Sequence, residues 1–270
     1  MEYYRGKNIL ITGAFGGFGR CFIKALLENG ARLILSDAPG NPAFTATGVE
    51  ALPEVKTALN NQIISLIPAD LSNAEGCREL YHEYGKLGVE LDMIIHNAGI
   101  AFLGNYHDVP LENSEKLISI NLLAPMRLNR AFLPELIERR SGHLIYVSSV
   151  AGFVATPLGA AYSTSKFGLR AFAMAVHGEV RRYGIRTSIV YPFWSKTAIM
   201  KSECFGNPMV RTMPDFYASS PGYVVDCTLR GAARKRLHIL PGFFSRIMWL
   251  AVRFYPVIAA QRRMNEKLIG

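Results

Sequence analysis

The sequence has few cysteines and few charged residues for its length. Four cysteines are spread over 270 residues, no two form a C-x-x-C motif, and none has a histidine at metal-ligand spacing. This pattern disfavours a disulfide scaffold, a zinc module or another metal site, and it fits a reducing compartment. Charged residues make up 19% and hydrophobic residues 50% of the chain. That balance argues against disordered, collagen-like and coiled-coil proteins.

Targeting and linker signals are also missing. The first segment, MEYYRGKNILITG, has no basic stretch followed by a long apolar run, so we expect no signal peptide and a cytoplasmic location. No internal repeat, low-complexity tract or linker divides the chain, and 270 residues suffice for one large domain with a sizeable core. We therefore expect one large domain over residues 1–240, followed by an extension over 241–270.

The positive charge is concentrated at the C-terminal end. The net charge is +9, and the segment Gly231–Gly270 alone contains eight Lys or Arg and one acidic residue. Little net charge is left for the body of the protein, so the basic balance belongs to one segment and not to the fold. We expect no nucleic-acid partner.

Short apolar segments alternate with longer helical patterns. The expected strands are Asn8–Ile11, Arg32–Ser36, Ile63–Pro68, Asp92–His96, His143–Ser148, Arg186–Val190 and Leu237–Leu240, and the expected helices are Phe18–Asn29, Ala74–Leu87, Glu112–Glu138 and Ala161–Tyr183. Most of these strands lack polar alternation, which is typical of sheets covered by helices on both faces. The pattern predicts an α/β fold, a single-domain Rossmann-type doubly wound parallel sheet that binds ligands at its strand ends.

The first expected strand runs directly into a glycine-rich turn. In TGAFGGFG (Thr12–Gly19), the glycines Gly13, Gly17 and Gly19 would let the backbone approach a pyrophosphate at a helix N-terminus. Glycines also close ordinary strand–helix turns, so the motif alone is weak. Asp37 adds support, because an acid that ends the second strand can accept hydrogen bonds from ribose hydroxyls. The alternative is that Asp37 only caps a loop.

The same carboxylate bears on the choice of cofactor. It would repel a 2′-phosphate, and neither Gly16 nor Ala38 offers a basic side chain for one. The sequence therefore favours NAD over NADP. Asp70-Leu71 follows the third strand, where an acid could meet the adenine amino group, and Asn97-Ala98-Gly99 follows the fourth. Taken alone, either segment could be ordinary turn chemistry.

A second set of polar residues follows the fifth expected strand. Ser149 ends that strand, and Tyr162 and Lys166 lie four residues apart on the next helix, so they share one face. An ammonium beside a phenol lowers the tyrosine pKa and makes Tyr162 a candidate general acid or base. Ser149 could hold the same alcohol oxygen. Asn121 is a polar residue in an apolar helical pattern and needs a partner if it is buried.

Together these motifs make the chain resemble the short-chain dehydrogenase/reductase family over nearly its whole length. TGAFGGFG resembles the family's glycine motif and HNAG its N-N-A-G, while INLLAP, YVSSVAG and YSTSK carry Asn121, Ser149, Tyr162 and Lys166. The resemblance implies a tyrosine that transfers the proton, a lysine that lowers its pKa and binds the nicotinamide ribose, a serine that orients the substrate oxygen, and an asparagine that holds a water. It also implies seven strands and homodimers or homotetramers built on the helices Glu112–Glu138 and Ala161–Tyr183.

The family pattern assigns the contacts. Expected cofactor contacts are Gly13, Phe15, Gly17, Phe18, Gly19, Asp37, Asp70, Leu71, Asn97, Ala98, Gly99, Tyr162, Lys166, Pro192 and Thr197, and expected substrate contacts are Ser149, Tyr162, Phe193 and Trp194. Three positions depart from the pattern. Phe15 is bulky for the turn, His96 replaces the first Asn of N-N-A-G, and Phe193 stands where a glycine is usual after Pro192. Phe193 or Trp194 could wall the substrate pocket instead.

The last third of the chain bears on the substrate. Residues 197–223 correspond to the family's substrate lid, and the segment contains Met200, Phe205, Met209, Met213, Phe216 and Tyr217. An apolar lid suits an apolar substrate, and packing under a long loop is the alternative. The extension 241–270 has apolar runs too short for a membrane span. It is expected to form a basic amphipathic helix up to Pro256 that either contacts a membrane interface peripherally or packs on the protein.

We expect an NAD(H)-dependent oxidoreductase that interconverts a secondary alcohol and a ketone on a hydrophobic, lipid-like substrate. Asn121, Ser149, Tyr162 and Lys166 would carry the proton chemistry. The alternative is a non-catalytic NADH-binding regulator or scaffold whose tail docks on a membrane or partner. Retention of both Tyr162 and Lys166 argues against that alternative.

Overall fold

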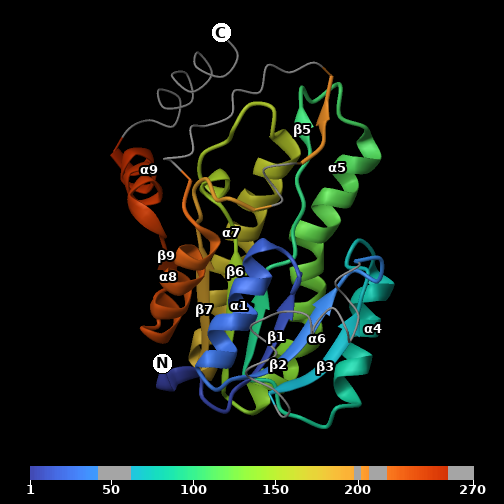
Figure 1. The fold of residues 1–270 in the computed structure, drawn as a ribbon, viewed down its shortest axis with the longest axis vertical. Coiled ribbons are helices and arrows are strands. Elements are labelled where there is room, and N and C mark those ends of the chain that lie inside the picture. The colour runs from blue at the N-terminus through green and yellow to red at the C-terminus, as the bar shows by residue number, and fades with distance from the viewer. Residues whose placement is uncertain (42–61, 198–201, 207–217, 255–270) are drawn as a thin grey trace.

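A single parallel sheet organises the protein. The computed structural model describes residues 1–41, 62–197, 202–206 and 218–254. Seven strands lie in the order β3-β2-β1-β4-β6-β7-β9, and every neighbouring pair is parallel. The chain proceeds outward from β1 in one direction and from β4 in the other, so the point where strand order reverses lies between β1 and β4 (Figure 1). The predicted doubly wound sheet is confirmed.

The sheet strands follow the apolar segments of the sequence. They are β1 Asn8–Thr12, β2 Arg32–Asp37, β3 Ile63–Pro68, β4 Met93–His96, β6 Gly142–Val147, β7 Ile185–Val190 and β9 His238–Ile239. Each lies within one residue of its predicted bounds. Every residue of β1 and β4 is buried, as expected for central strands covered on both faces.

The helices cover both faces of this sheet. The α-helices are α1 Gly17–Glu28, α4 Ala74–Gly85, α5 Leu111–Ile118, α6 Ala124–Glu138, α7 Ala160–Val180, α8 Pro221–Ala233 and α9 Gly242–Phe254, and short helical turns are η1 Glu2–Tyr4, η2 Ser119–Leu123, η3 Val150–Gly152 and η4 Arg181–Tyr183. Helix α1 packs against α8, whereas α4 packs against α6 and α5 against α7. Within the described ranges, no helix is both long and apolar enough to cross a membrane.

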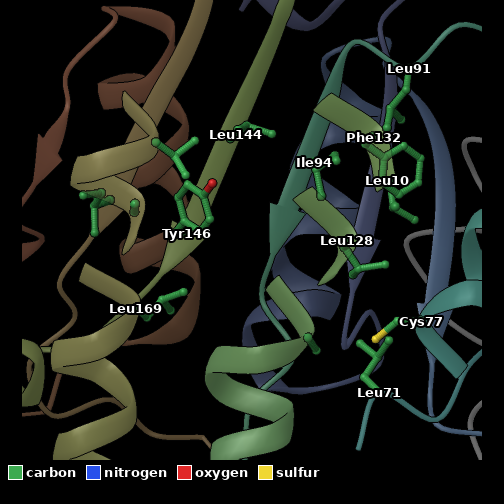
Figure 2. Packing of buried hydrophobic residues seen from close by; sticks show 14 of the residues in the cluster. Leu10, Leu71, Cys77, Leu91, Ile94, Leu128, Phe132, Leu144, Tyr146 and Leu169 are labelled. Carbon is green, nitrogen blue, oxygen red and sulfur yellow. The ribbon is translucent and has the colours of Figure 1, made fainter. Parts of the chain in front are cut away.

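Alternate residues of the central strands belong to two different hydrophobic cores. Leu10 and Ile94 belong to the core under α4, α6 and α7, whereas Ile9, Ile11 and Ile95 belong to the core under α1 and α8. Figure 2 shows the first of these cores, with Leu128 and Phe132 of α6 beside Ile94 of β4. Because successive side chains of a strand point to opposite faces, one apolar strand supplies both cores.

Helix α8 has no counterpart among the predicted helices, and two further features of the fold differ from the sequence-based prediction. A two-stranded parallel sheet pairs β5 (Leu103–Gly104) with β8 (Cys204–Phe205). The helix predicted as continuous over Glu112–Glu138 is interrupted by the π-helical turn η2. A π-turn is an irregularity of one turn inside an α-helix, and such turns often mark functional sites.

The expected lid falls largely outside the described residues. Met200, Met209, Met213, Phe216 and Tyr217 lie there, as does Pro256 of the C-terminal extension. Phe205 is described, and its ring lies 6.1 Å from that of Phe102. The described part of the extension is α9, and its residues Met248, Trp249 and Val252 pack against the core of the catalytic domain.

Candidate active site

The turn between β1 and α1 can be built only with glycine at its first position. Gly13 has φ +62°, and a Cβ there would lie 2.7 Å from the Cα of Ala98. Gly17 faces the other flank, where a Cβ would meet the side chain of Thr197 at 2.9 Å. Gly19 packs α1 directly on the backbone of Gly13 and Ala14. The glycines therefore bring three chain segments together at the sheet switch point.

Polar side chains brace the same turn from β4. The Nδ2 of Asn97 donates to the carbonyl oxygens of Thr12 (3.1 Å) and Gly13 (2.8 Å). The Thr12 hydroxyl accepts hydrogen bonds from the backbone N–H groups of Asn97 and Ala98, each at 3.2 Å. Asn97 thus holds the cofactor turn in place in addition to bordering the cavity. Thr12 was missed as a site residue, although its place at the end of β1 was a usable signal.

Asp37 ends β2 and faces this turn. Its carboxylate accepts hydrogen bonds from the backbone N–H groups of Phe15 and Ala38, both at 2.8 Å. Asp37 therefore does cap the loop, as the alternative interpretation predicts, through these two hydrogen bonds. A carboxylate has about four lone-pair positions, so acceptor capacity remains for ribose hydroxyls, and Asp37 borders the cavity described next.

A cavity of about 220 Å³ lies over the switch point. Its lining comprises Gly13, Gly16, Gly17, Phe18, Asp37, Ala38, Asn41, Ala69, Asp70, Leu71, Asn97, Ala98, Gly99, Ile100, Ile120 and Thr197. Ten of the fifteen predicted cofactor residues are in this set. The small residues of the turn, the acid at the end of β2 and the helix N-terminus of α1 together fit a dinucleotide.

Five predicted cofactor residues do not border this cavity: Phe15, Gly19, Tyr162, Lys166 and Pro192. The Phe15 side chain is buried in the core under α1, and only its backbone reaches the site through Asp37. Gly19 serves the packing of α1, and the carbonyl of Pro192 accepts a hydrogen bond from Val150 (3.0 Å). Lining residues that the sequence-based prediction missed, such as Ile100 and Ile120, are apolar and carry no motif.

Tyr162 and Ser149 meet at the C-terminal end of β6. The side chains are hydrogen-bonded to each other, and Ser149 Oγ also accepts from the backbone N–H of Ala151 at 3.1 Å. Burial raises the pKa of Tyr162 above its usual value, and the hydrogen bond with Ser149 opposes that rise. The expected lowering of the Tyr162 pKa is therefore wrong, because loss of hydration raises the pKa and Ser149, not Lys166, is the group that opposes the rise.

Lys166 lies beneath Tyr162 on α7. Its Nζ is 5.6 Å from the centre of the Tyr162 ring and donates to the carbonyl oxygen of Val147 at 3.0 Å. The residue is only 3% exposed, and this burial lowers its pKa to about 8. The ammonium is thus still mostly protonated at neutral pH and can donate to a further acceptor.

Asn121 sits in the π-turn η2 and closes the site from the other side. It exchanges two hydrogen bonds with the backbone of Ile100, each 2.9 Å, and donates to Ser165 Oγ at 3.1 Å. A Cβ on Gly99 would lie 3.2 Å from Asn121 Oδ1 and 3.5 Å from Lys166 Nζ. Asn121 and Lys166 therefore converge on Gly99, at the edge of the cavity, and the buried asparagine has the partners it requires.

His96 takes a structural place below the site. It is buried, its Nε2 is 2.8 Å from Asn129 Oδ1, and its ring stacks on Tyr146. Burial lowers the pKa of His96 to about 4, so the imidazole is neutral at pH 7. His96, which replaces the first Asn of the family motif, thus joins β4 to α6 and does not line the cavity.

Phe193 and Trp194 follow β7 but make different contacts. The Phe193 ring lies 5.7 Å from that of Phe244 on α9. The Nε1 of Trp194 is buried, and among the described residues no acceptor lies within hydrogen-bond distance of it. Phe193 thereby connects the strand end beside the site to the C-terminal helix.

Comparisons of the sequence with known proteins agree with this geometry. A family model described as short chain dehydrogenase matches residues 7–204. The chain is 31% identical over 245 residues to dehydrogenase/reductase SDR family member 7C-B of Danio rerio, covering 87% of this chain and 74% of that protein. It is 27% identical over 263 residues to a putative oxidoreductase, SadH, of Mycobacterium tuberculosis, covering 94% and 92% of the two chains.

Solved structures have the same fold. A short-chain dehydrogenase from Sphingobium yanoikuyae in complex with NADPH superimposes with a TM-score of 0.77 at 23% identity, covering 96% of this chain and 95% of that one. A short-chain dehydrogenase/reductase from Burkholderia phymatum in complex with NAD gives 0.76 at 21% identity, with coverage of 100% and 96%. Similar folds thus occur with either nucleotide.

Proposed function

The chain belongs to the short-chain dehydrogenase family, and from this premise we propose that it is an NAD(H)-dependent oxidoreductase. In this proposal it interconverts a secondary alcohol and a ketone on a hydrophobic, lipid-like substrate. The observation that carries the proposal is the group formed by Tyr162, Ser149 and Lys166 beside the glycine-turn cavity. A half-buried tyrosine that is bonded to a serine and has an ammonium beside its ring is suited to transfer a proton to or from an oxygen.

Each side chain has a distinct part in the proposed chemistry. Tyr162 gives a proton to the substrate oxygen during reduction and takes it back during oxidation, and Ser149 orients that oxygen by a hydrogen bond. Lys166 can stabilise the tyrosinate, because its ammonium lies 5.6 Å from the Tyr162 ring. Asn121, which is bonded to Ile100 and Ser165, would hold a water of the proton relay. The nicotinamide, when bound, supplies or accepts the hydride.

The preference for NAD rests on Asp37 and Ala38. Relatives of this fold bind NADPH or NAD, so the neighbours do not decide the cofactor. Both Asp37 and Ala38 border the cavity, and a carboxylate there repels a 2′-phosphate. Ribose hydroxyls would instead find the remaining acceptor positions of Asp37.

Aromatic residues that follow β7 and flank the β5–β8 sheet support a hydrophobic substrate. Phe193 packs against Phe244, and Phe102 against Phe205, beside the small β5–β8 sheet. Pockets lined by aromatic side chains with few polar groups favour apolar ligands, oriented by those few groups. Ser149 and Tyr162 would be the orienting groups here.

Large apolar side chains on α6 and α7 support a homodimer or homotetramer. Met126, Phe167 and Met174 are each more than a third exposed, and such side chains are typical of subunit interfaces. Light scattering coupled to size-exclusion chromatography of the full chain would give a dimer or tetramer mass. A monomer at all concentrations would contradict this part of the proposal.

Replacement of Tyr162 by Phe tests the proposed chemistry. We expect turnover of long-chain ketones and steroids to fall by about 10³-fold, in the range of general acid–base catalysis, while NADH affinity stays within about twofold. Tyr81→Phe on α4, an exposed tyrosine remote from the cavity, is the matched control and should retain full turnover.

Two outcomes would overturn the proposal. Retained turnover in Tyr162→Phe would remove the tyrosine from the chemistry. Tight NADH binding by the unaltered protein with no turnover across a broad alcohol and ketone panel would favour the non-catalytic regulator.

A further inference from the structure

Helix α9 has two apolar faces, and the fold uses only one of them. Ser245, Trp249 and Val252 face the domain, where the Trp249 ring lies 5.2 Å from those of Phe153 and Tyr191. On the opposite side, Phe243, Ile247 and Leu250 are 69%, 42% and 53% exposed. Spacings of four and three residues put these three side chains in one stripe along the helix. Figure 1 shows α9 at the outer edge of the molecule, beside α8.

Arginines border this exposed stripe. Arg246 and Arg253 are exposed and, seven residues apart, lie on one flank of the stripe. Between α8, β9 and α9 lies a cavity of about 370 Å³, whose lining includes Arg230, Arg234, Arg236 and Arg246. Arg230 is paired with Asp226. For the other three, no carboxylate of the described residues lies within ion-pair distance.

The sequence beyond α9 is also mostly basic. The sequence after α9 adds Arg262, Arg263 and Lys267 against the single acid Glu266. Guanidinium groups without acidic partners are suited to bidentate binding of phosphate. The positive potential favours an anionic partner, and the exposed stripe requires that this partner also bury apolar side chains.

Other occupants fit the two observations less well. A second copy of the chain meeting the same face would set the arginines of one cavity against those of the other, a repulsive arrangement. Nucleic acid would match the charge but leave Phe243, Ile247 and Leu250 in contact with water. An anionic bilayer offers phosphates at its surface and an apolar region directly below them.

We propose that the exposed stripe of α9 and the adjoining arginine cavity form a docking surface for bilayers rich in anionic phospholipid. Phe243, Ile247 and Leu250 enter the headgroup–acyl boundary, and Arg234, Arg236 and Arg246 bind lipid phosphates. Docking in this way brings the strand end at Phe193 close to the membrane, because Phe193 packs against Phe244 of the same helix. The proposal does not depend on the reaction or the cofactor.

Vesicle flotation of the full chain tests this surface. The protein should float with vesicles of phosphatidylcholine and phosphatidylglycerol, bind pure phosphatidylcholine about tenfold less or weaker, and be released by high salt. The double variant Ile247→Asp/Leu250→Asp should lose binding by about tenfold or more. The triple variant Arg234→Gln/Arg236→Gln/Arg246→Gln should lose a similar factor on the anionic vesicles.

Matched changes elsewhere serve as controls. Leu111→Asp alters a side chain that is 63% exposed on α5, at the opposite edge of the molecule from α9 (Figure 1). Arg181→Gln/Arg182→Gln removes two exposed charges from η4. Both controls should float like the unaltered protein, and all variants should keep its melting temperature.

Several results would overturn the proposal. One is failure of the unaltered protein to float with anionic vesicles, and another is equal loss in the variants and their controls. If the protein bound inorganic phosphate but did not float with vesicles, the arginine cavity would be a site for free anions and not for lipid. A change of oligomer mass in the α9 variants, with no vesicle binding by any form, would assign the surface to a second copy.

Discussion

The cofactor end of the sheet and its C-terminal edge are held together in different ways. At the cofactor end, backbone lies on backbone: Gly13 meets Ala98, and Asn97 bonds to the carbonyls of Thr12 and Gly13. At the C-terminal edge, α9 attaches through side chains, with Trp249 set among Tyr191, His238 and Arg170. The first arrangement tolerates almost no added atom, whereas the second depends on the volume of one ring.

This difference explains what each region can contribute to function. The backbone of the glycine turn and of Asn97–Gly99, called the cradle below, suits a cofactor that is the same in every turnover. The shape of this cradle does not depend on side-chain rotamers. A helix attached by one face leaves its other face available for a partner. We therefore expect substitutions at the cofactor end to alter nucleotide binding and substitutions on α9 to alter docking, whereas crowding or loss of packing in either region lowers stability.

The largest expected effect on stability comes from crowding the cradle. Gly13→Ala adds a Cβ at φ +62° and 2.7 Å from the Cα of Ala98, which should lower the free energy of unfolding by roughly 2–5 kcal/mol and abolish measurable NADH binding. Gly6 has φ +70° with nothing near its Cβ position. Gly6→Ala should therefore lose only about 1–2 kcal/mol and bind NADH normally. Denaturant unfolding and NADH titration measure both, and equal NADH affinity in the two variants would contradict the account.

A pH titration probes the strand that carries the cradle. Burial holds the pKa of His96 at about 4, below its unfolded value of about 6.5. Between these values the unfolded chain binds the proton and the native protein does not, so stability falls as the pH drops from 6.5 to 4. His143, also buried with a lowered pKa of about 3, acts in the same direction over that window.

The variant His96→Asn should remove roughly half of that pH dependence, about 3 kcal/mol between pH 6.5 and 4. Denaturant unfolding at several pH values measures the slope. His82→Asn on α4, whose ring is exposed, is the control and should leave the slope unchanged. An unchanged slope in His96→Asn would mean that His96 is protonated in the native state.

A smaller effect is expected from the ring that anchors α9. Trp249→Ala removes contacts with Phe153 and Tyr191 and the stacking of Arg170 at 5.0 Å, and should lower the free energy of unfolding by about 2–3 kcal/mol. Leu250→Ala, on the exposed face, should change it by less than about 0.5 kcal/mol. Both variants should bind NADH as the unaltered protein does. Equal losses in the two variants would mean that α9 does not attach through one face.

Much of the fold follows from local sequence signals, because buried parallel strands are short apolar runs between turn residues. All seven predicted sheet strands are present. The π-turn around Asn121 was missed because the sequence on both sides of it is helical and the turn has no motif of its own. The β5–β8 pair was missed because strands of two residues have no period.

The residues of the candidate site also differ in how well the sequence predicts them. Gly13 and Asp37 were recognisable because few residue types can do what those positions need. Ile100 and Ile120 were not, because any apolar residue would serve in the cavity wall. The pKa direction of Tyr162 was mispredicted, since the sequence shows the neighbouring lysine but not the depth of burial. The exposed stripe of α9 required knowing which of its two apolar faces meets the domain.

The proposed preference of the glycine turn and Asp37 for NAD can be tested by one fluorescence titration. NADH and NADPH are titrated into the unaltered protein and into Asp37→Ala. We predict that the unaltered protein binds NADH at least about tenfold more tightly, and that Asp37→Ala loses most of this preference because the carboxylate no longer repels the 2′-phosphate. Equal or tighter NADPH binding by the unaltered protein would contradict the account.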